Sequence, residues 1–156
     1  MNDQSIKLRC ANFNDAQTIL RWEQMPELRG VTDLEEALTL DFVCRHMLSA
    51  TNITTDGQVR FIIERANGTA VGTLDIYNAC DGAAEVGVFV DPYYRRSGHA
   101  LEALRLGAEY ALSHSLHTLS ATVHTSNKAS VALFEKAGYK ATEQSTGDTI
   151  RLILSL

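Results

Sequence analysis

The feature that most constrains the fold is a set of three apolar segments separated by two turn dipeptides, Asn67-Gly68 and Asp81-Gly82. The segments are the strand candidates Val59–Ile63, Ala70–Tyr77 and Ala84–Val90. Asn-Gly and Asp-Gly supply the positive φ values that tight hairpin turns require. The pattern therefore predicts a three-stranded antiparallel meander in the middle of the chain.

Helical periodicity flanks this meander on both sides. The earlier elements are a strand at Lys7–Cys10, a helix that Asn12 or Asn14 can cap and Met25-Pro26 interrupts, and a helix opened by Asp33 with Phe42 and Leu48 on its apolar stripe. The later elements are a helix from Gly98 to about His114 with Leu104 and Leu112 inward, a strand at Leu119–Val123, a helix at Asn127–Ala137, and a hairpin joining Tyr139–Glu143 to Thr149–Leu154. This order predicts an α/β fold whose mixed, mostly antiparallel sheet carries helices on both faces. Without a repeat or linker, residues 1–156 are expected to form a single domain.

Composition excludes several classes of function. The 14 basic and 19 acidic residues give a net charge of −5, which argues against a nucleic-acid partner. No apolar run reaches the ~18 residues of a membrane helix, and the polar start is no signal peptide. Cys10, Cys44 and Cys80 form no C-x-x-C pair, which indicates reduced thiols, buried as small apolar residues, in a cytoplasmic protein. The histidines form no ligand pattern, so no metal is expected.

The segment Val88–Ala100 carries the first chemical signal. A buried strand stops at Asp91-Pro92, and the following turn leads into a helix N-terminus. Such ends expose unpaired N–H groups and bind phosphate. Gly98 and Ala100 leave room for a close approach, and Arg95 and Arg96 add positive charge. The segment is either a pyrophosphate cradle or an ordinary helix cap made by Ser97.

A second segment, Asn127–Tyr139, reads N-K-A-S-V-A-L-F-E-K-A-G-Y. Together with Arg95–Ala100 (R-R-S-G-H-A), it resembles the GNAT superfamily of acetyl-CoA-dependent N-acetyltransferases, whose motifs are R/Q-x-x-G-x-G/A and N-x-x-S-x-x-L-[YF]-x-x-x-G-[FY]. The resemblance covers about residues 5–145 and implies the acyl-CoA N-acyltransferase fold, with acetyl-CoA as cosubstrate.

The resemblance also implies roles for individual residues. Backbone groups of Val88 and Val90 would bind the pantetheine arm in an opening of the sheet, and an N–H near Phe89 or Val90 would polarise the thioester carbonyl. The amides of the cradle would hold the pyrophosphate; these belong to Arg96, Ser97, Gly98, His99 and Ala100. Asn127 would contact the cofactor and Lys136 an outer phosphate; the alternatives are a helix cap and a solvated charge.

Glu85 is the candidate for handling the proton of the attacking amine. An aliphatic amine is mostly protonated at neutral pH, so a base or water relay must accept a proton. Glu85 lies inside an apolar strand, where burial would raise its pKa. Binding the cationic acceptor and simple surface exposure are the alternatives.

Phe134 departs from the family pattern. Many members carry Tyr at this position, and that phenol is proposed to protonate the leaving thiolate, which Phe134 cannot do. Thiolate is a fair leaving group without help, because a thiol pKa is ~8.5. Ser130, Tyr139 or water could replace the missing acid.

The acceptor side is expected at the first two helices. Trp22-Glu23-Gln24-Met25-Pro26-Glu27 resembles the W-E-x-x-P-E pattern of a bacterial subgroup related to spermidine and ribosomal-protein N-terminal acetyltransferases. Six acids between Glu23 and Asp41 form an acidic lip that could steer a polyamine, or they are solvated helix faces. Trp22 could stack a cation or anchor the core.

These features leave two classes of function open. The first is N-acetyltransfer to a small polyamine-like amine, with a peptide or ribosomal-protein N-terminus as second choice. The other is a non-catalytic acyl-CoA-binding module, which Phe134 makes conceivable. The resemblance allows a homodimer by analogy alone.

Overall fold

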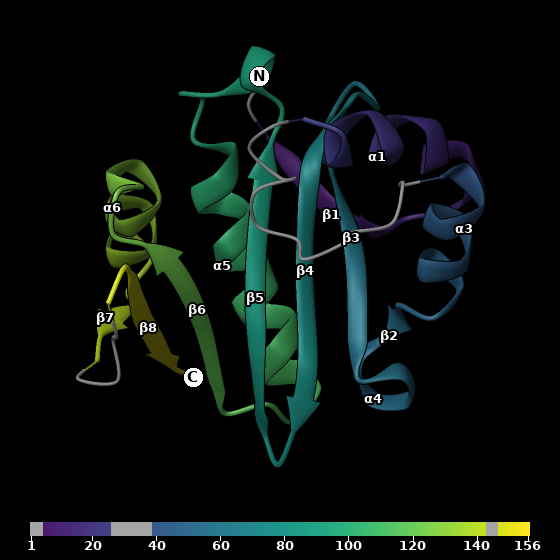
Figure 1. Cartoon of the computed structure of the whole chain (residues 1–156). Helices are drawn as coiled ribbons and strands as arrows, with labels where there is room; N and C mark the ends of the chain where they lie inside the picture. Colours follow the sequence, from purple (N-terminus) through teal and green to yellow (C-terminus); the bar gives the residue numbers. More distant parts are fainter. Residues whose placement is uncertain (1–4, 26–38, 143–146) are drawn as a thin grey trace.

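The computed structural model describes residues 5–25, 39–142 and 147–156. One eight-stranded sheet runs through it in the order β1-β3-β4-β5-β6-β8-β7, with β2 paired to β3 (Figure 1). The strands are β1 (Ile6–Cys10), β2 (Thr51–Asn52), β3 (Gln58–Arg65), β4 (Ala70–Cys80), β5 (Ala83–Val90), β6 (Thr118–His124), β7 (Lys140–Ala141) and β8 (Thr149–Ser155). All neighbours are antiparallel except β5 and β6, which are parallel. The predicted fold class and meander, β3-β4-β5, are confirmed.

Helices cover both faces of the sheet. They are α1 (Ala16–Glu23), α3 (Leu40–Leu48), the single turn α4 (Ile53–Asp56), α5 (His99–Ser113) and α6 (Lys128–Lys136), with short 3-10 turns η1 (Phe13–Asp15) and η2 (Pro92–Tyr94). Figure 1 shows α5 behind the sheet and α1 with α3 on the opposite side. Two apolar cores follow from this arrangement: a large one beneath α5 and α6, and a smaller one beneath α1 and α3. No helix among the described residues is long and apolar enough to cross a membrane.

The helix faces differ in part from the expected stripes. Leu48 and Leu112 were expected inward, but they are 64% and 57% exposed. The buried side of α5 instead centres on Leu104 and Gly107. A Cβ at Gly107 would lie 2.6 Å from the Leu74 Cδ2 atom, so α5 approaches β4 over its small residues and the buried stripe is rotated. Thr39 caps α3, whereas the expected start at Asp33 lies outside the described residues.

The prediction that the cysteines are buried is wrong for two of the three. Cys10 and Cys80 are exposed and Cys44 is half-buried, all as free thiols. Cys10 ends β1, a strand at the edge of the sheet, and Cys80 is the last β4 residue before the hairpin tip. Strand ends at such places have few neighbours to cover them.

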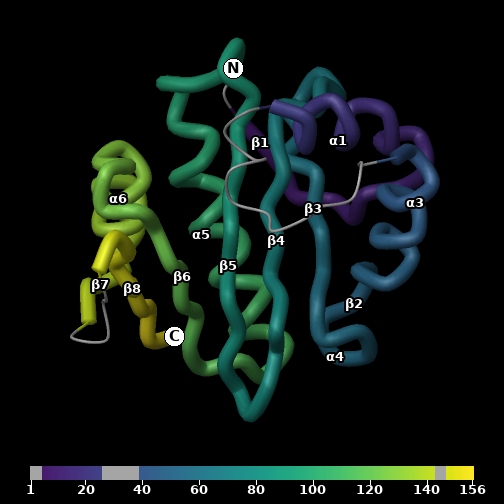
Figure 2. The backbone as a smooth tube through the Cα atoms, in the orientation of Figure 1, coloured from purple at the N-terminus to yellow at the C-terminus, as the bar shows by residue number. Residues whose placement is uncertain are grey.

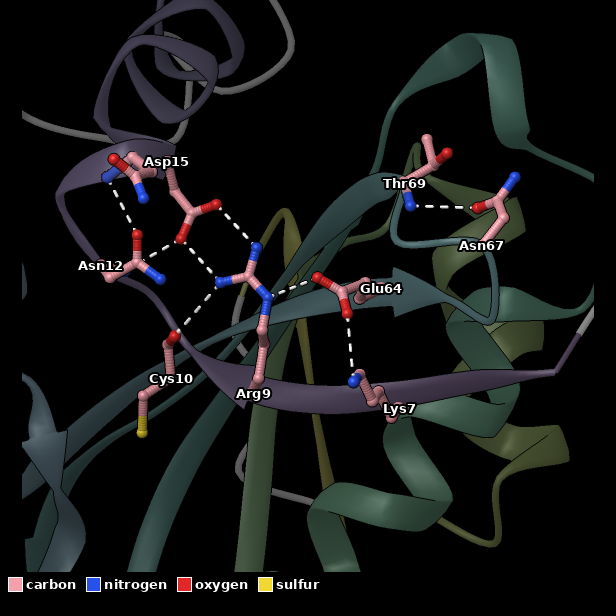
Figure 3. Close-up of polar contacts among 9 residues, drawn as sticks. Lys7, Arg9, Cys10, Asn12, Asp15, Glu64, Asn67 and Thr69 are labelled. Atoms are coloured by element: carbon pink, nitrogen blue, oxygen red, sulfur yellow. Dashed lines mark hydrogen bonds and ion pairs between the residues drawn. The ribbon is translucent and has the colours of Figure 1, made fainter.

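A charged network ties the edge strand β1 to its surroundings (Figure 3). The Arg9 guanidinium donates to both carboxylate oxygens of Asp15, each at 2.8 Å, and also pairs with Glu64, which Lys7 contacts at 3.3 Å. Burial works to raise the pKa of Asp15, but Arg9 and the Asn12 N–H outweigh it and hold that pKa below its ordinary value. The network therefore joins β1, β3 and the start of α1.

Candidate functional site

The sheet opens where its two parallel strands diverge. β5 pairs with β6 only at Ala83, Ala84 and Glu85, although its pairing with β4 continues to Val90. Among the described residues, no pairing joins β5 and β6 beyond Glu85 and Ser120, and Figure 2 shows the two traces separating. The upper half of β5 therefore has one paired side and one side without a strand partner.

The direction of the backbone groups along β5 follows from one hydrogen bond. The Asp91 N–H donates to the Val71 oxygen on β4 at 2.8 Å. The N–H and C=O groups of successive strand residues point to opposite sides of the strand. Those of Phe89 therefore also point toward β4, while those of Val88 and Val90 point toward the opening. Consistent with this direction, the Val90 carbonyl accepts a hydrogen bond from Arg95 Nε at 2.9 Å. Of the two expected N–H donors, the one of Phe89 therefore points toward β4, and the one of Val90 points toward the opening.

The turn after β5 leads a row of backbone N–H groups into the N-terminus of α5. Arg96 and Gly98 both take left-handed backbone conformations, with φ of 64° and 78°. Gly98 occupies the N-cap position of α5 without a side-chain cap, so the alternative in which Ser97 caps this helix is wrong. The first intrahelical bond runs from the Glu102 N–H to the Gly98 oxygen, which leaves the earlier amides of α5 without intrahelical partners. Such an arrangement binds anions.

Of the two arginines in the turn, Arg95 contacts the end of the strand. Both are exposed, but the Arg95 guanidinium lies over the Phe89 ring, 5.7 Å from its centroid, and its Nε bonds the Val90 carbonyl. Arg95 is therefore turned back along the strand end. That it adds charge to the cradle stays a prediction.

His99, the first residue of α5, is 3% exposed. Its Nδ1 has no hydrogen-bond partner among the described residues. Burial lowers the pKa of His99, and the positive charge of Arg65 lowers it further. The side chain is therefore a neutral core group, and His99 can contribute to an anion site through its backbone amide.

The second motif forms α6 and its cap. The Asn127 side chain accepts a hydrogen bond from the Ser130 N–H at 3.1 Å, so it caps the helix, and its own NH₂ group is not used in that bond. Lys136 is exposed in the last turn. Phe134 is buried and meets the Tyr139 ring edge-on at 5.1 Å. Burial raises the pKa of Tyr139, whose hydroxyl has no hydrogen-bond partner in the described part of the chain.

Glu85 lies at the base of the opening, in the last pair that joins β5 to β6. It is half-buried, and its Oε2 accepts a hydrogen bond from Asn78 Nδ2 at 2.6 Å. Tyr77, opposite Glu85 on β4, has a pKa raised by burial and then by the Glu85 and Asp75 carboxylates. A Cβ at Gly87 would meet only the Tyr77 ring, at 4.0 Å, so the side of β5 two residues beyond Glu85 is uncrowded.

The expected acceptor residues have other partners. Trp22 is 1% exposed, packs 5.9 Å from the Phe89 ring and donates its Nε1–H to Asp91 at 2.8 Å. Of the two alternatives for Trp22, it therefore anchors the core, and a ring this buried is not open to a substrate cation. The Glu23 carboxylate pairs with Arg60 at 3.0 Å, and Arg60 also pairs with Asp75 at 2.7 Å.

Of the expected acidic lip, only two members fall within the described residues, and both are paired. Glu23 is held by Arg60, and Asp41 pairs with Arg45 at 3.0 Å. Glu27 and the other acids of the lip lie outside the described residues. The described part of the chain holds no group of three or more His, Cys, Asp or Glu that could bind a metal ion.

Sequence reasoning did not identify Asp91 as a site residue. An aspartate before a proline at a strand end is a recognisable cap of the next turn, and Asp91 does accept a bond from the Tyr93 N–H at 2.9 Å. Its second bond, from Trp22, joins positions 69 residues apart and leaves no local signal.

The comparisons agree with this geometry. A family model described as an acetyltransferase (GNAT) domain matches residues 6–140. Spermidine N-acetyltransferase from Vibrio cholerae, solved with CoA and spermine, is 18% identical and has a TM-score of 0.77 over 99% of this chain and 96% of that one. A domain from Methanocaldococcus jannaschii is 19% identical and has a TM-score of 0.80 over 97% and 99%. No curated protein sequence matches the chain.

Proposed function

Because this chain belongs to the GNAT acetyltransferase family, and is thus an acetyl-CoA-dependent N-acetyltransferase, we propose that its acceptor is the primary amine of a polyamine-like small molecule. The observation that carries the cofactor side of this proposal is the opening between β5 and β6, beside which the outward backbone groups of Val88 and Val90 have no strand partner among the described residues.

The cradle and the opening fit the two ends of acetyl-CoA. The amides from Arg96 to Ala100 hold the pyrophosphate, since they lie at a helix N-terminus that follows two left-handed residues. The pantetheine arm then extends along β5 as a substitute strand and bonds Val90 and Val88 in turn. The Asn127 NH₂ group and Lys136 are further proposed contacts from α6.

The thioester lies deepest in the opening, because the phosphate end is held beyond the end of the strand. Val88 is the deeper of the two outward residues, so its N–H is better placed than that of Val90 to polarise the thioester carbonyl. The neutral amine attacks this carbon, and the resulting oxyanion is stabilised by the N–H, an interaction commonly worth about 3 kcal/mol. Collapse forms the amide and releases coenzyme A thiolate.

Glu85 takes the ammonium proton through water. It precedes Val88 by three residues, which corresponds to roughly 10 Å along a strand, too far for a direct hydrogen bond. Its half-buried position, with the uncrowded Gly87 between it and Val88, supports a short chain of waters between the carboxylate and the amine. Glu85 also attracts the cationic acceptor, so its two expected roles belong to successive steps.

The thiolate takes up a proton from solvent or from the attacking amine. Phe134 supplies no acid, and Tyr139 is a weak donor because burial raises its pKa. Protonation is not required for departure, since thiolate is a fair leaving group.

The polyamine preference is supported by the similar Vibrio cholerae enzyme, which was solved with spermine. The chain's own net charge of −5 also favours a cationic acceptor. A peptide N-terminus, ribosomal-protein N-termini included, is the second candidate. A single domain and a cytoplasmic location remain predictions. A homodimer is also only a prediction, although a similar Vibrio cholerae structure is dodecameric.

The test is thiol release from acetyl-CoA in the presence of an amine panel. The panel holds spermidine, spermine, putrescine, aminoglycosides, single amino acids and short peptides with free N-termini. Turnover confined to polyamines supports the proposal, whereas turnover confined to peptides moves the function to protein N-termini. CoA binding without any turnover would favour the acyl-CoA-binding module and overturn the proposal.

A further inference from the structure

Three side chains lie at the end of β5: Trp22 of α1, Asp91 directly after the strand, and Arg95 of the turn. We call them the strand-end clamp. Their contacts with the strand are to its last two residues, Phe89 and Val90. Trp22 and Arg95 both contact the Phe89 ring, with Trp22 at 5.9 Å and the Arg95 guanidinium at 5.7 Å from its centroid.

Asp91 is the centre of the clamp, and each of its polar groups is used. Oδ2 accepts the Trp22 Nε1–H at 2.8 Å, Oδ1 accepts the Tyr93 N–H at 2.9 Å, and the Asp91 N–H bonds Val71 on β4. Asp91 is 7% exposed. Burial works to raise its pKa, but the Trp22 and Tyr93 donors with nearby positive charge hold that pKa below its ordinary value. A buried, ionised carboxylate held by several donors has a fixed orientation.

Arg95 holds the other side of the strand end. Its Nε donates to the Val90 carbonyl, one of the outward groups beside the opening. Because the N–H and C=O of one strand residue point the same way, fixing this carbonyl also fixes the direction of the Val90 N–H.

We propose that the strand-end clamp positions the outward amides of Val90 and Val88 for the thioester arm, and that Arg95 serves this purpose instead of binding phosphate. The proposal rests on the proposed acetyl transfer. The three side chains are positioning residues, since they act through the β5 backbone. A misplacement of about 1 Å at a reacting centre can cost about 100-fold in rate, so a small rotation of the strand end has a large kinetic effect.

Charge-retaining variants of the two arginines separate positioning from phosphate binding. Lysine still attracts phosphate, but it cannot reproduce the Nε–H geometry of arginine. We expect R95K and R95Q both to lower kcat at saturating acetyl-CoA by about 10-fold, with KM for acetyl-CoA changed less than threefold. In R96Q, by contrast, we expect a raised KM for acetyl-CoA, and R96K should recover it. If R95K matches wild type while R95Q raises only KM, Arg95 is a phosphate ligand and the proposal is overturned for it.

The bond between Trp22 and Asp91 is tested by W22F, D91N and the double variant. W22F removes the indole N–H and keeps an aromatic ring against Phe89. Each single variant should lower kcat by about 10-fold, and the double variant should lose less than the product of the two single losses, because both substitutions weaken the same bond. R105Q is the control, since Arg105 is 56% exposed and its ion-pair partners, Glu102 and Glu109, belong to α5; its kcat should stay within twofold of wild type.

Melting temperatures and circular dichroism accompany each variant, so that kcat is expressed per folded enzyme. Lower melting temperatures with unchanged kcat would mean that the clamp is only structural and would overturn the proposal. Wild-type turnover with unaffected clamp variants overturns this inference alone. Wild-type enzyme that turns over no amine overturns the proposed function with it.

Discussion

The two sides of the opening are built in different ways. On the proposed cofactor side, the candidate groups are backbone amides of a contiguous strand and turn, residues 88–100. On the side of α1 and α3, the charged groups come from distant positions and bind each other, as Glu23, Arg60 and Asp75 do. A backbone site survives many side-chain changes, whereas a site made of ion pairs depends on each partner.

A hydrogen bond connects the two sides of the opening. Trp22 belongs to α1 and Asp91 directly follows β5, and the Trp22 Nε1–H donates to Asp91 at 2.8 Å. Substitutions near the strand end of β5 should therefore act on stability and activity through close packing. Substitutions beside α1 and α3 should act through the loss of an ion-pair partner.

The largest loss of stability is expected for a substitution of Gly72, which pairs with Val90 from β4. A Cβ there would lie 2.0 Å from the Phe89 carbonyl oxygen and 2.9 Å from the Val90 Cα atom. Both are backbone atoms that cannot move aside, so Gly72→Ala should lower the free energy of unfolding by about 3 kcal/mol and displace the strand end. Urea denaturation measures this loss.

Gly87→Ala is the matched control for Gly72→Ala, because a Cβ at that β5 glycine meets only a ring atom at 4.0 Å. Its free energy of unfolding should stay within about 1 kcal/mol of wild type. Equal losses at the two glycines would contradict the idea that close backbone packing sets the strand end.

The next effect concerns Glu85. Glu85→Gln keeps the side-chain size and can still pair with Asn78, but it removes the proton acceptor. We expect kcat/KM for the amine to fall by about 100-fold and its rise with pH to change shape. Glu135→Gln, an exposed carboxamide substitution on α6, is the control. Unchanged kinetics in Glu85→Gln would exclude it as the base.

Glu23 tests the side built from ion pairs. Because its carboxylate is only 16% exposed and pairs with Arg60, Glu23→Gln should cost about 2 kcal/mol of folding free energy and change KM for spermidine less than twofold. Asp41→Asn breaks the exposed pair with Arg45 and should cost at most about 0.5 kcal/mol. A large rise in KM for spermidine in Glu23→Gln with unchanged stability would restore Glu23 as an acceptor contact.

The smallest effect is a pH dependence of the free energy of unfolding, which comes from Asp15 beside β1. Asp15 has a folded-state pKa below its unfolded value of about 3.9, so its contribution to stability is complete above that pH and is lost as the pH falls below it. Asp15→Asn should therefore be less stable than wild type by about 1–2 kcal/mol at pH 7 and by less at pH 3. A stability difference that is the same at both pH values would show that ionisation of Asp15 contributes nothing.

Local signals predicted the backbone structure of the meander and of the turn after β5 well. The turn dipeptides, the strand that stops at Asp91-Pro92 and the helix that begins just after Gly98 are all properties of short stretches, and each lies where the pattern placed it. The same signals did not reveal which way Arg95 turns, because that depends on the packed Phe89 ring.

The acceptor side was harder to predict for a physical reason. Charge along a helix does not reveal its partner, and Arg60 lies 37 residues from Glu23 in the sequence. Similarly, a tryptophan on a helix gives no sign that its N–H meets Asp91. Tertiary pairs of this kind become visible only once the sheet brings the segments together.

The most direct test is amide hydrogen exchange along β5 with and without coenzyme A, resolved residue by residue by NMR. If the pantetheine arm pairs with the outward side of the strand, Val88 and Val90 should exchange more slowly when coenzyme A is bound. Phe89, whose N–H faces β4, should exchange at the same rate in both states. Slowing at Phe89 alone, or no change at Val88 and Val90 when coenzyme A is bound, would contradict the assignment of this opening as the acetyl-CoA site.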